Sequence, residues 1–90
     1  MIFTVAWVAE AVDELADLWL VAADRDRVTA AAGTIDRNLR QDPQTQGESR
    51  DGNVRILFEH PLGVDFEIIE DDRIVFVLSV WRTDELRPKA

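Results

Sequence analysis

The hydrophobic pattern changes its period twice along the first half of the chain. Residues Ile2 to Val8 are rich in Phe, Thr, Val and Trp, which fit a pleated, half-buried strand. Beyond them, apolar residues recur three or four positions apart in two successive stripes, as on one face of a helix. The first stripe comprises Val12, Leu15, Trp19 and Ala22, and the second comprises Val28, Ala32, Ile35 and Leu39. Polar residues at 24–26 separate the stripes and Pro43 follows the second, so the pattern predicts a strand and then an antiparallel helical hairpin.

The second half of the chain shows the short periods of strands. Residues 43–53 are polar and rich in turn formers, so we expect a loop there. Three strand patterns follow at 54–59, 64–69 and 74–80, with hairpin turns expected at 60–63 and 70–73. Such short connections require antiparallel neighbours, and the last strand is apolar almost throughout, which favours an interior position in the sheet. The predicted fold is therefore α+β, with element order β-α-α-β-β-β and one sheet that carries both helices on one face.

Length and composition limit the classes of protein that this chain can be. Ninety residues predict a single domain over residues 1–90, since a second core could not be built from what remains. No run of about 18 apolar residues occurs, and the first residues do not resemble a signal peptide, so we expect a cytoplasmic protein without a membrane segment. The sequence contains no cysteine, which excludes disulfides, thiolate catalysis and thiolate metal sites.

The charge balance argues against a general nucleic-acid binder. The chain has 18 acidic against 10 basic residues and a net charge of −8, whereas affinity for phosphate backbones comes mainly from lysine and arginine. Lys89 is the only lysine, and arginine favours bidentate pairing with carboxylate or phosphate groups. Arginine-rich composition can equally reflect coding bias, and both interpretations stay open at this point.

Several local strings resemble the RelE/ParE superfamily of bacterial toxins. The segment 5–15 (VAWVAEAVDEL) is similar to the opening of that family, a strand that ends in an aromatic residue before a helix with small and acidic residues. The segment 63–68 (GVDFEI) is similar to its middle strand, and 74–82 (IVFVLSVWR) to its aliphatic last strand with a basic exit. The strings follow one another at the family's spacing and cover nearly the whole chain.

The resemblance implies the toxin half of a toxin–antitoxin module, a type of module associated with plasmid stabilisation. The expected partner is an antitoxin protein, and the expected target is either messenger RNA on the ribosome or DNA gyrase. The ribonuclease members would act by electrostatic and acid–base catalysis, in which lysine and arginine stabilise phosphate charge and a tyrosine or histidine transfers protons. Neither a cofactor nor a metal ion is implied.

Carrying the family pattern onto this sequence assigns roles to a few residues. Arg55 and Arg82 match basic catalytic positions, while Arg50 and Trp81 are candidates for contact with the target. Glu67 stands where the family usually has arginine, which reverses the charge. The chain also contains no tyrosine, so a catalytic tyrosine is missing.

Each candidate also has an ordinary structural interpretation. The arginines could pair with acids such as Glu59 or Glu67 across the sheet instead of forming a patch that faces phosphate. His60 could transfer protons, although a histidine in a solvent-exposed turn is commoner. We expect Trp19 in the core, because it lies on the helical stripe. The acidic run at 70–72 is expected to be a solvated turn, since it lacks the spacing of a calcium loop.

The expected function is that of a RelE/ParE-like toxin that acts without ribonuclease chemistry. The principal alternative is a toxin-fold protein that has lost catalysis and serves as a protein-binding module. A further alternative is an interaction domain for a basic target, suggested by the net charge of −8. A continuous positive face with Arg50, Arg55 and Arg82 would favour a toxin that contacts phosphate, whereas neutralised arginines would favour the binding module.

Overall fold

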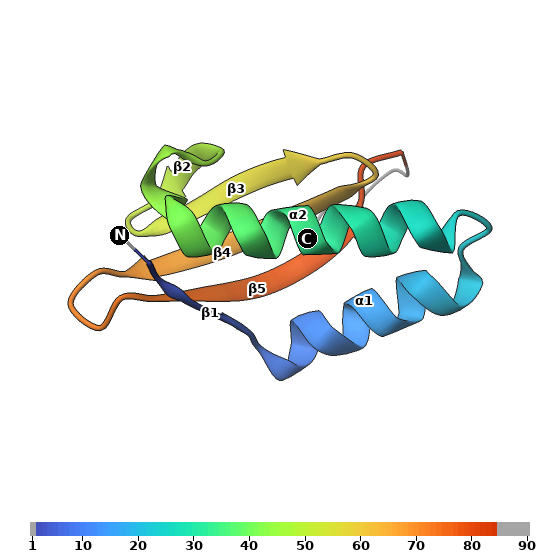
Figure 1. Cartoon of the computed structure of the whole chain (residues 1–90), viewed down its shortest axis with the longest axis horizontal. Coiled ribbons are helices and arrows are strands. Elements are labelled where there is room, and N and C mark those ends of the chain that lie inside the picture. Colours follow the sequence, from blue (N-terminus) through green and yellow to red (C-terminus); the bar gives the residue numbers. More distant parts are fainter. Residues whose placement is uncertain (1, 85–90) are drawn as a thin grey trace.

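Five strands form one sheet, and two helices lie across one of its faces in the computed structural model (Figure 1). The structure describes residues 2–84. The elements, in chain order, are β1 (Thr4–Trp7), α1 (Ala9–Val21), α2 (Arg25–Gln41), the 3₁₀ helix η1 (Pro43–Thr45), β2 (Glu48–Asp51), β3 (Val54–Glu59), β4 (Leu62–Ile69) and β5 (Ile74–Arg82).

The strand order across the sheet is β1-β5-β4-β3-β2. Strands β2 to β5 form an antiparallel meander, and β1 pairs with β5 in parallel. A parallel pair needs a long crossover connection, and the helical hairpin begins that crossover on one face of the sheet (Figure 1). The predicted α+β class, the helices on one face and the interior position of the last strand are confirmed.

Strand β2 lies where the sequence predicted only a loop. Residues 43–53 contain η1 and an edge strand that pairs with β3, so the meander has four strands rather than three. All four residues of β2 are exposed, and a strand that buries no side chain lacks the hydrophobic alternation by which strands are predicted. At the entry to β2, Gly47 has φ 64°, and a Cβ there would lie 2.0 Å from the carbonyl oxygen of Ile56. Close contact between two backbones therefore decides where this strand pairs.

The hydrophobic core lies between α2 and the central strands. Helix α2 buries four residues of one face: Val28, Ala31, Ile35 and Leu39. Strand β4 contributes every second side chain to the core: Leu62, Val64, Phe66 and Ile68. This agrees with the predicted stripe of α2, except that Ala31 is buried more completely than Ala32. The buried positions of α2 therefore follow the 3.6-residue period of the apolar stripe in the sequence.

Helix α1 departs from its predicted stripe. Only Ala11 is fully buried, whereas Val12 is 50% exposed and Trp19 is 41% exposed, so the prediction that Trp19 lies in the core is wrong. The helix packs mainly on β5 at one side of the sheet, and α2 covers only part of its remaining surface (Figure 1). An apolar groove of about 420 Å³ remains between the two helices, lined by residues that include Val12, Leu15 and Trp19.

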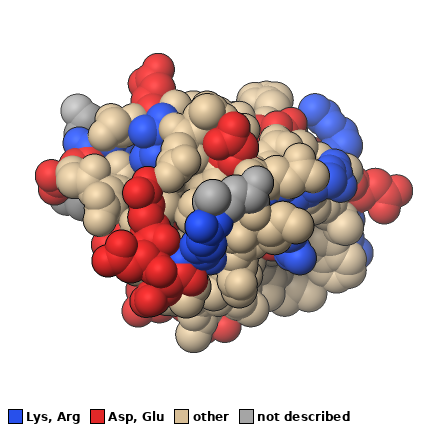
Figure 2. Space-filling model, turned by 60° about the vertical axis from the view of Figure 1, so that its left-hand side comes forward, with Lys and Arg blue, Asp and Glu red and all other residues tan. Residues whose placement is uncertain are grey.

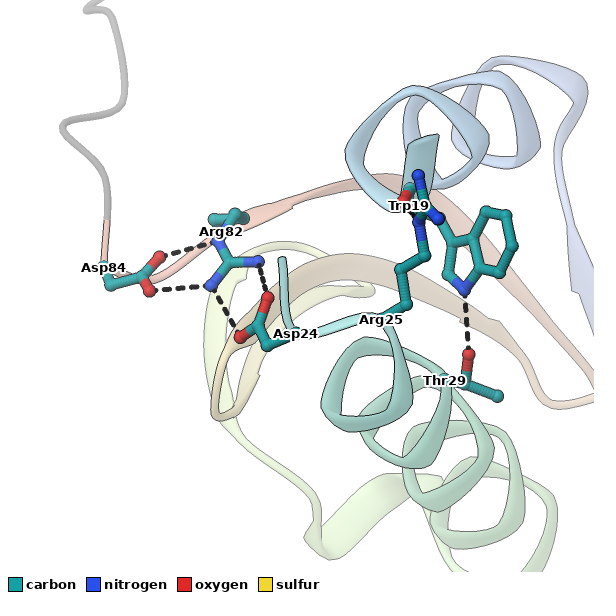
Figure 3. A network of polar contacts seen from close by, with 6 residues as sticks. All are labelled: Trp19, Asp24, Arg25, Thr29, Arg82 and Asp84. Atoms are coloured by element: carbon teal, nitrogen blue, oxygen red, sulfur yellow. Dashed lines mark hydrogen bonds and ion pairs between the residues drawn. The ribbon is translucent and has the colours of Figure 1, made fainter. Parts of the chain in front are cut away.

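The indole of Trp19 is nevertheless held in place at the connection between the helices (Figure 3). Its Nε1 donates a hydrogen bond to the Thr29 hydroxyl at 3.1 Å, and the Arg25 guanidinium lies 4.7 Å from the ring centroid. Arg25 also donates to the carbonyl oxygens of Trp19 and Leu20 at 2.9 and 2.6 Å. The Trp19 carbonyl also accepts a hydrogen bond from the Ala22 amide at 3.3 Å, and a cation is favoured at this end of the helix.

A bulge interrupts the pairing of β4 with β5. Asp65 lies opposite Ser79 and Phe66 lies opposite Val77, so Leu78 has no residue opposite it in β4. The extra residue shifts the alternation of β5 by one. Val77 before the bulge and Val80 after it both face the core as a result. The sheet keeps its apolar side toward the helices along the whole strand.

The turn between β3 and β4 is shorter than the sequence predicted. Strand β4 begins at Leu62, directly after the cis peptide bond between His60 and Pro61. Pro61 is buried, and its carbonyl oxygen accepts a hydrogen bond from the Thr83 amide at 2.8 Å. This turn is thereby attached to the end of β5.

Neither helix in the part of the chain that the structure describes has the length and hydrophobicity to cross a membrane.

Candidate functional site

Arg82, the last residue of β5, lies between two aspartates (Figure 3). Its guanidinium binds Asp24 in a bidentate fashion, with nitrogen–oxygen distances of 2.9 and 3.0 Å. A second pair of bonds, of 2.9 and 2.8 Å, joins it to Asp84. The Arg82 side chain is only 11% exposed. We call Asp24, Arg82 and Asp84 the arginine clamp.

The arginine clamp connects the helical hairpin to the sheet. Asp24 stands between α1 and α2 at the N-cap position of α2, but its side chain makes no capping hydrogen bond and binds Arg82 instead. The carboxylate of Asp24 therefore connects α2 to the sheet and does not cap the helix. Planar, two-pronged pairing of this kind is the strongest geometry available to arginine and carboxylate.

The charges within the clamp stabilise one another. Hydrogen bonds from Arg82 lower the pKa of Asp24, and they lower the pKa of Asp84 to about 2. Hydrogen bonds to Asp84 and then to Asp24 raise the pKa of Arg82 further above its ordinary value. At neutral pH the clamp therefore contains one cation and two anions. Its net charge is negative, so it offers little attraction to a phosphate group.

Arg55, the other candidate catalytic residue, is also engaged by the protein itself. Its Nε and one terminal nitrogen donate to the backbone oxygens of Gln46 and Gly47, each at 2.9 Å. These bonds fix the approach to β2. Glu59 and Glu67 were the acids considered as partners on sequence grounds. The hydrogen bonds of Arg55 go to backbone oxygens instead, and the ion pairs of Arg82 include Asp24 and Asp84.

The strand register decides which side of the sheet these arginines face. Arg55 lies opposite Phe66, and Arg82 lies opposite Leu62. Both partners are buried beneath the helices, and residues directly opposite in a sheet project to the same face. Both arginines therefore belong to the side of the sheet that carries the helices. We call the other side the open face.

The predicted arginine patch is not brought together. Arg55 and Arg82 occupy strands on either side of β4 and differ by about 13 Å along the strand direction, at about 3.3 Å per residue. Arg50 is exposed in the irregular pairing of the edge strand β2. Figure 2 shows acidic side chains gathered at one side of the face it presents, with basic side chains dispersed between neutral ones.

Trp81, a candidate for contact with the target, lies half-buried on the open face. A Cβ at Gly63 would lie 2.8 Å from the Trp81 ring, so the indole rests directly on the backbone of β4. Phe58 meets the indole edge-on, with ring centroids 6.3 Å apart and an interplanar angle of 82°. Phe58 itself is 60% exposed. The two rings form an aromatic pair at the end of the sheet where β3 meets β4.

His60 and the acidic residues give little support to catalysis or metal binding. The His60 ring nitrogen Nδ1 is 2.5 Å from the Thr83 hydroxyl, which suits a structural contact between the β3–β4 turn and the end of β5. Among residues 2–84, no group of three histidine, aspartate or glutamate side chains is arranged to hold a metal ion. The described residues thus present arginines held by carboxylates or backbone, together with an aromatic pair on the open face.

Known proteins resemble this chain in structure rather than in sequence. No protein-family model matches it, and no curated protein matches it. The toxin–antitoxin complex RelBE2 from Mycobacterium tuberculosis contains a chain of the same fold, with a TM-score of 0.74, 19% identity, and coverage of 91% of this chain and 99% of that one. The chromosomal ParDE TA system from P. aeruginosa gives a TM-score of 0.69 at 17% identity, over 92% and 98% of the two chains. This chain has the RelE/ParE toxin fold.

A mutant of the E. coli RelE toxin in the free state shares the RelE/ParE fold as well. Its TM-score is 0.67 at 15% identity, over 93% of this chain and 86% of that one. These coverages leave no large part of either chain unmatched. The resemblance inferred from local strings is thus confirmed for the fold.

Sequence reasoning missed the residues that control the candidate arginines of this RelE/ParE-fold chain. Nothing in the local pattern marks Asp24 as a partner of Arg82, which lies 58 positions away. Asp84 carried a weak signal, since it stands two residues after Arg82 at the end of a strand. Gly63, on which the Trp81 indole rests, also carried a weak signal, because a glycine within a strand often marks a close approach by another group.

Proposed function

We propose that this chain is the toxin component of a toxin–antitoxin pair and acts in the cytoplasm without cutting RNA. In this proposal an antitoxin protein binds the chain and holds it inactive. The toxin then acts by binding a protein target, as a gyrase-type inhibitor would, and needs no catalytic group of its own.

The proposal of a toxin rests on the fold. The neighbours include a toxin–antitoxin complex from Mycobacterium tuberculosis and an archaeal RelE–RelB complex from Pyrococcus horikoshii, and each is matched over nearly its full length. A fold alone does not fix activity, so the assignment is carried over by analogy with these complexes. It gives a direct reason to expect a protein partner.

The arginine clamp is the observation that argues against ribonuclease chemistry. A catalytic arginine must turn its charge toward the developing negative charge on phosphate. Arg82 instead makes four hydrogen bonds to two carboxylates and faces the helix side. Glu67 adds a negative charge to the open face, where an arginine was expected from the family pattern.

Growth on induction tests the proposed toxin. The chain is expressed alone and together with the protein encoded by the adjacent reading frame. We expect growth arrest only when the chain is expressed alone. If the toxin needs no arginine catalysis, Arg55→Ala and Arg82→Ala arrest growth as the parent does, at matched soluble protein levels. Arg37→Ala, at an exposed position on α2, is the control. If messenger RNA were cleaved during growth arrest and the Arg82→Ala variant no longer cleaved it, action without RNA cleavage would be contradicted.

The second candidate function is a toxin-fold binding module without toxicity. It is favoured by the same neutralised arginines, because a clamp that ties β5 to the helical hairpin serves stability equally well. Growth without arrest, combined with a stable complex with the neighbouring protein, would support this second function. If induction causes no growth arrest and no complex forms with the neighbouring protein, both functions are rejected.

A further inference from the structure

The open face of the sheet has an arrangement of charge and aromatic groups that the toxin assignment does not explain. The strand register places its residues in rows that run across the strands. One row contains Phe58, Gly63 and Trp81; the next contains Glu48, Ile56, Asp65 and Ser79; the third contains Asp51, Val54, Glu67, Phe76 and Ala6. Within residues 2–84, both helices lie over the opposite side (Figure 1).

The charges in these rows have one sign. Four carboxylates occupy them, two on β2 and two on β4, and no lysine or arginine stands in any of the three rows. Arg55 and Arg82, which could have balanced them, face the helix side by register. Side chains of one sign on a surface favour a partner of the opposite sign, because complementary potentials raise the association rate and exclude like-charged competitors.

The apolar groups of the open face suit the same kind of partner. Phe58 is 60% exposed and stands against Trp81, so aromatic surface lies one row away from Asp65. An arginine or lysine side chain can place its aliphatic stem along apolar surface and its charged head over an aromatic ring or beside a carboxylate. Val54, Ile56 and Phe76 provide the apolar surface between the charges, all of them half-buried.

We propose that the open face is a docking surface for a cationic polypeptide segment rich in arginine or lysine. In the complex, cationic heads lie beside Glu67 and Asp65 and over the pair formed by Phe58 and Trp81. The inference concerns the chemistry of the partner and does not require toxicity. If the proposed antitoxin is the partner, its segment on this face is basic.

Titration with a synthetic peptide of alternating arginine and serine tests the docking surface. Backbone amide chemical shifts of the full-length chain are followed by NMR. We expect the largest shifts on the open face, around Phe58, Glu67 and Trp81, and a dissociation constant that rises steeply with added salt. The same peptide with glutamate in place of arginine should not bind. Single-stranded RNA should bind more weakly than the peptide, and if it bound more tightly the proposal would be overturned.

Charge variants provide the matched comparison. Glu67→Gln should weaken peptide binding by about fivefold, as expected for loss of one partly exposed charge pair, and Glu67→Arg should weaken it more. Asp17→Asn removes an exposed carboxylate from α1 on the helix side and should leave binding unchanged. Equal weakening by Asp17→Asn and Glu67→Gln, or shifts centred on α1 and α2, would refute docking at the open face.

The outcome is separable from that of the proposed function. If the neighbouring protein forms a complex that Glu67→Arg does not weaken, the toxin–antitoxin pair stands and the cationic docking surface is rejected. If the peptide binds as described but induction causes no growth arrest and no neighbour binds, the docking surface stands and the toxin assignment fails. Absence of peptide binding at low salt rejects the docking surface in either case.

Discussion

At the scale of single residues, side chains far apart in sequence determine what the candidate arginines can do. Arg82 carries the type of charge expected of a toxin, yet Asp24 and Asp84 occupy its donors. The sequence shows which residue type stands at this position, whereas its availability depends on a contact across 58 positions. Such contacts leave no trace in local periodicity, because neither partner changes the apolar pattern.

The arginine clamp predicts a pH-dependent stability. Arg82 lowers the pKa of Asp84 from 3.8 to about 2, so the unfolded chain takes up a proton on this group at higher pH than the folded chain does. The stabilisation from Asp84 is therefore complete above about pH 4 and is lost as the pH falls toward 2. Asp84→Asn should lower the melting temperature by a few degrees at pH 7, and the difference from the parent should shrink between pH 4 and 2.

Calorimetry across this pH range measures the effect, with Asp17→Asn as the control. Asp17 is exposed on α1 and lies outside the clamp, so its variant should follow the parent at every pH. A melting-temperature difference for Asp84→Asn that is constant from pH 7 to pH 2 would show that Asp84 does not act through its charge.

Gly63 predicts a second effect at the scale of one residue. Gly63→Ala places a methyl group 2.8 Å from the Trp81 ring, so the ring must turn away from β4. We expect a loss of about 1–3 kcal/mol in the free energy of unfolding, as for other overpacked positions. Tryptophan fluorescence should also shift to longer wavelength as the indole becomes exposed. In a Trp81→Phe background that spectral shift should vanish, and its persistence would mean that another tryptophan reports the change.

At the scale of elements, helices and strands with a periodic apolar pattern were predicted from the sequence, whereas a strand without such a pattern was missed. The stripe of α2 and the alternation of β4 follow the periods of helix and strand, and both are correct in the structure. Strand β2 has no buried side chain, so its pairing is set by backbone hydrogen bonds and the Gly47 turn. Trp19 lies on a helical stripe, but α1 sits at the side of the sheet and the stripe is only partly covered.

The entry to β2 gives a prediction for that element. Gly47→Ala combines a φ of 64° with a Cβ only 2.0 Å from the carbonyl oxygen of Ile56, so the two strands must separate locally. The free energy of unfolding should fall by about 1–3 kcal/mol, and amide exchange in β2 should accelerate. Urea unfolding measures the first and hydrogen exchange the second.

Gly33→Ala is the matched control for Gly47→Ala. Gly33 lies within α2, and a Cβ there has open space around it. Alanine at this site should stabilise the protein by about 0.5–1 kcal/mol, since glycine is unfavourable in a helix interior. Similar destabilisation by both variants would show that close contact at Gly47 is not the cause.

At the scale of the whole molecule, the net charge of −8 combines with the distribution of arginines. Four of the acidic residues stand on the open face, and two of the arginines are turned to the helix side. The charge total could be obtained from composition, but the separation of charges between two faces needed the strand register. The fold was therefore predictable in outline, while the functional meaning of the surface was not.

The charge distribution predicts weak binding of nucleic acid. Single-stranded RNA should bind with a dissociation constant no tighter than about 10⁻⁴ M at physiological salt, the weak end of non-specific binding. Fluorescence anisotropy of a labelled oligonucleotide measures it, with the E. coli RelE toxin as a reference protein of the same fold. If RNA bound saturably at micromolar concentration and Arg50→Ala abolished the binding, the result would support the predicted arginine patch that faces phosphate.

The unpaired Leu78 in β5 gives one irregularity of pairing a large effect on the surface. If β5 kept Leu78 but paired with β4 without the bulge, Leu78 would lie opposite Asp65, and from there on each residue would change sides, so Trp81 would turn inward and Arg82 outward. The presence or absence of a single bulge can thus invert the polarity of a surface while every arginine is kept. Among chains of this fold, an alignment that scores only residue types would count Arg82 as retained, although its side chain points to the opposite side of the sheet.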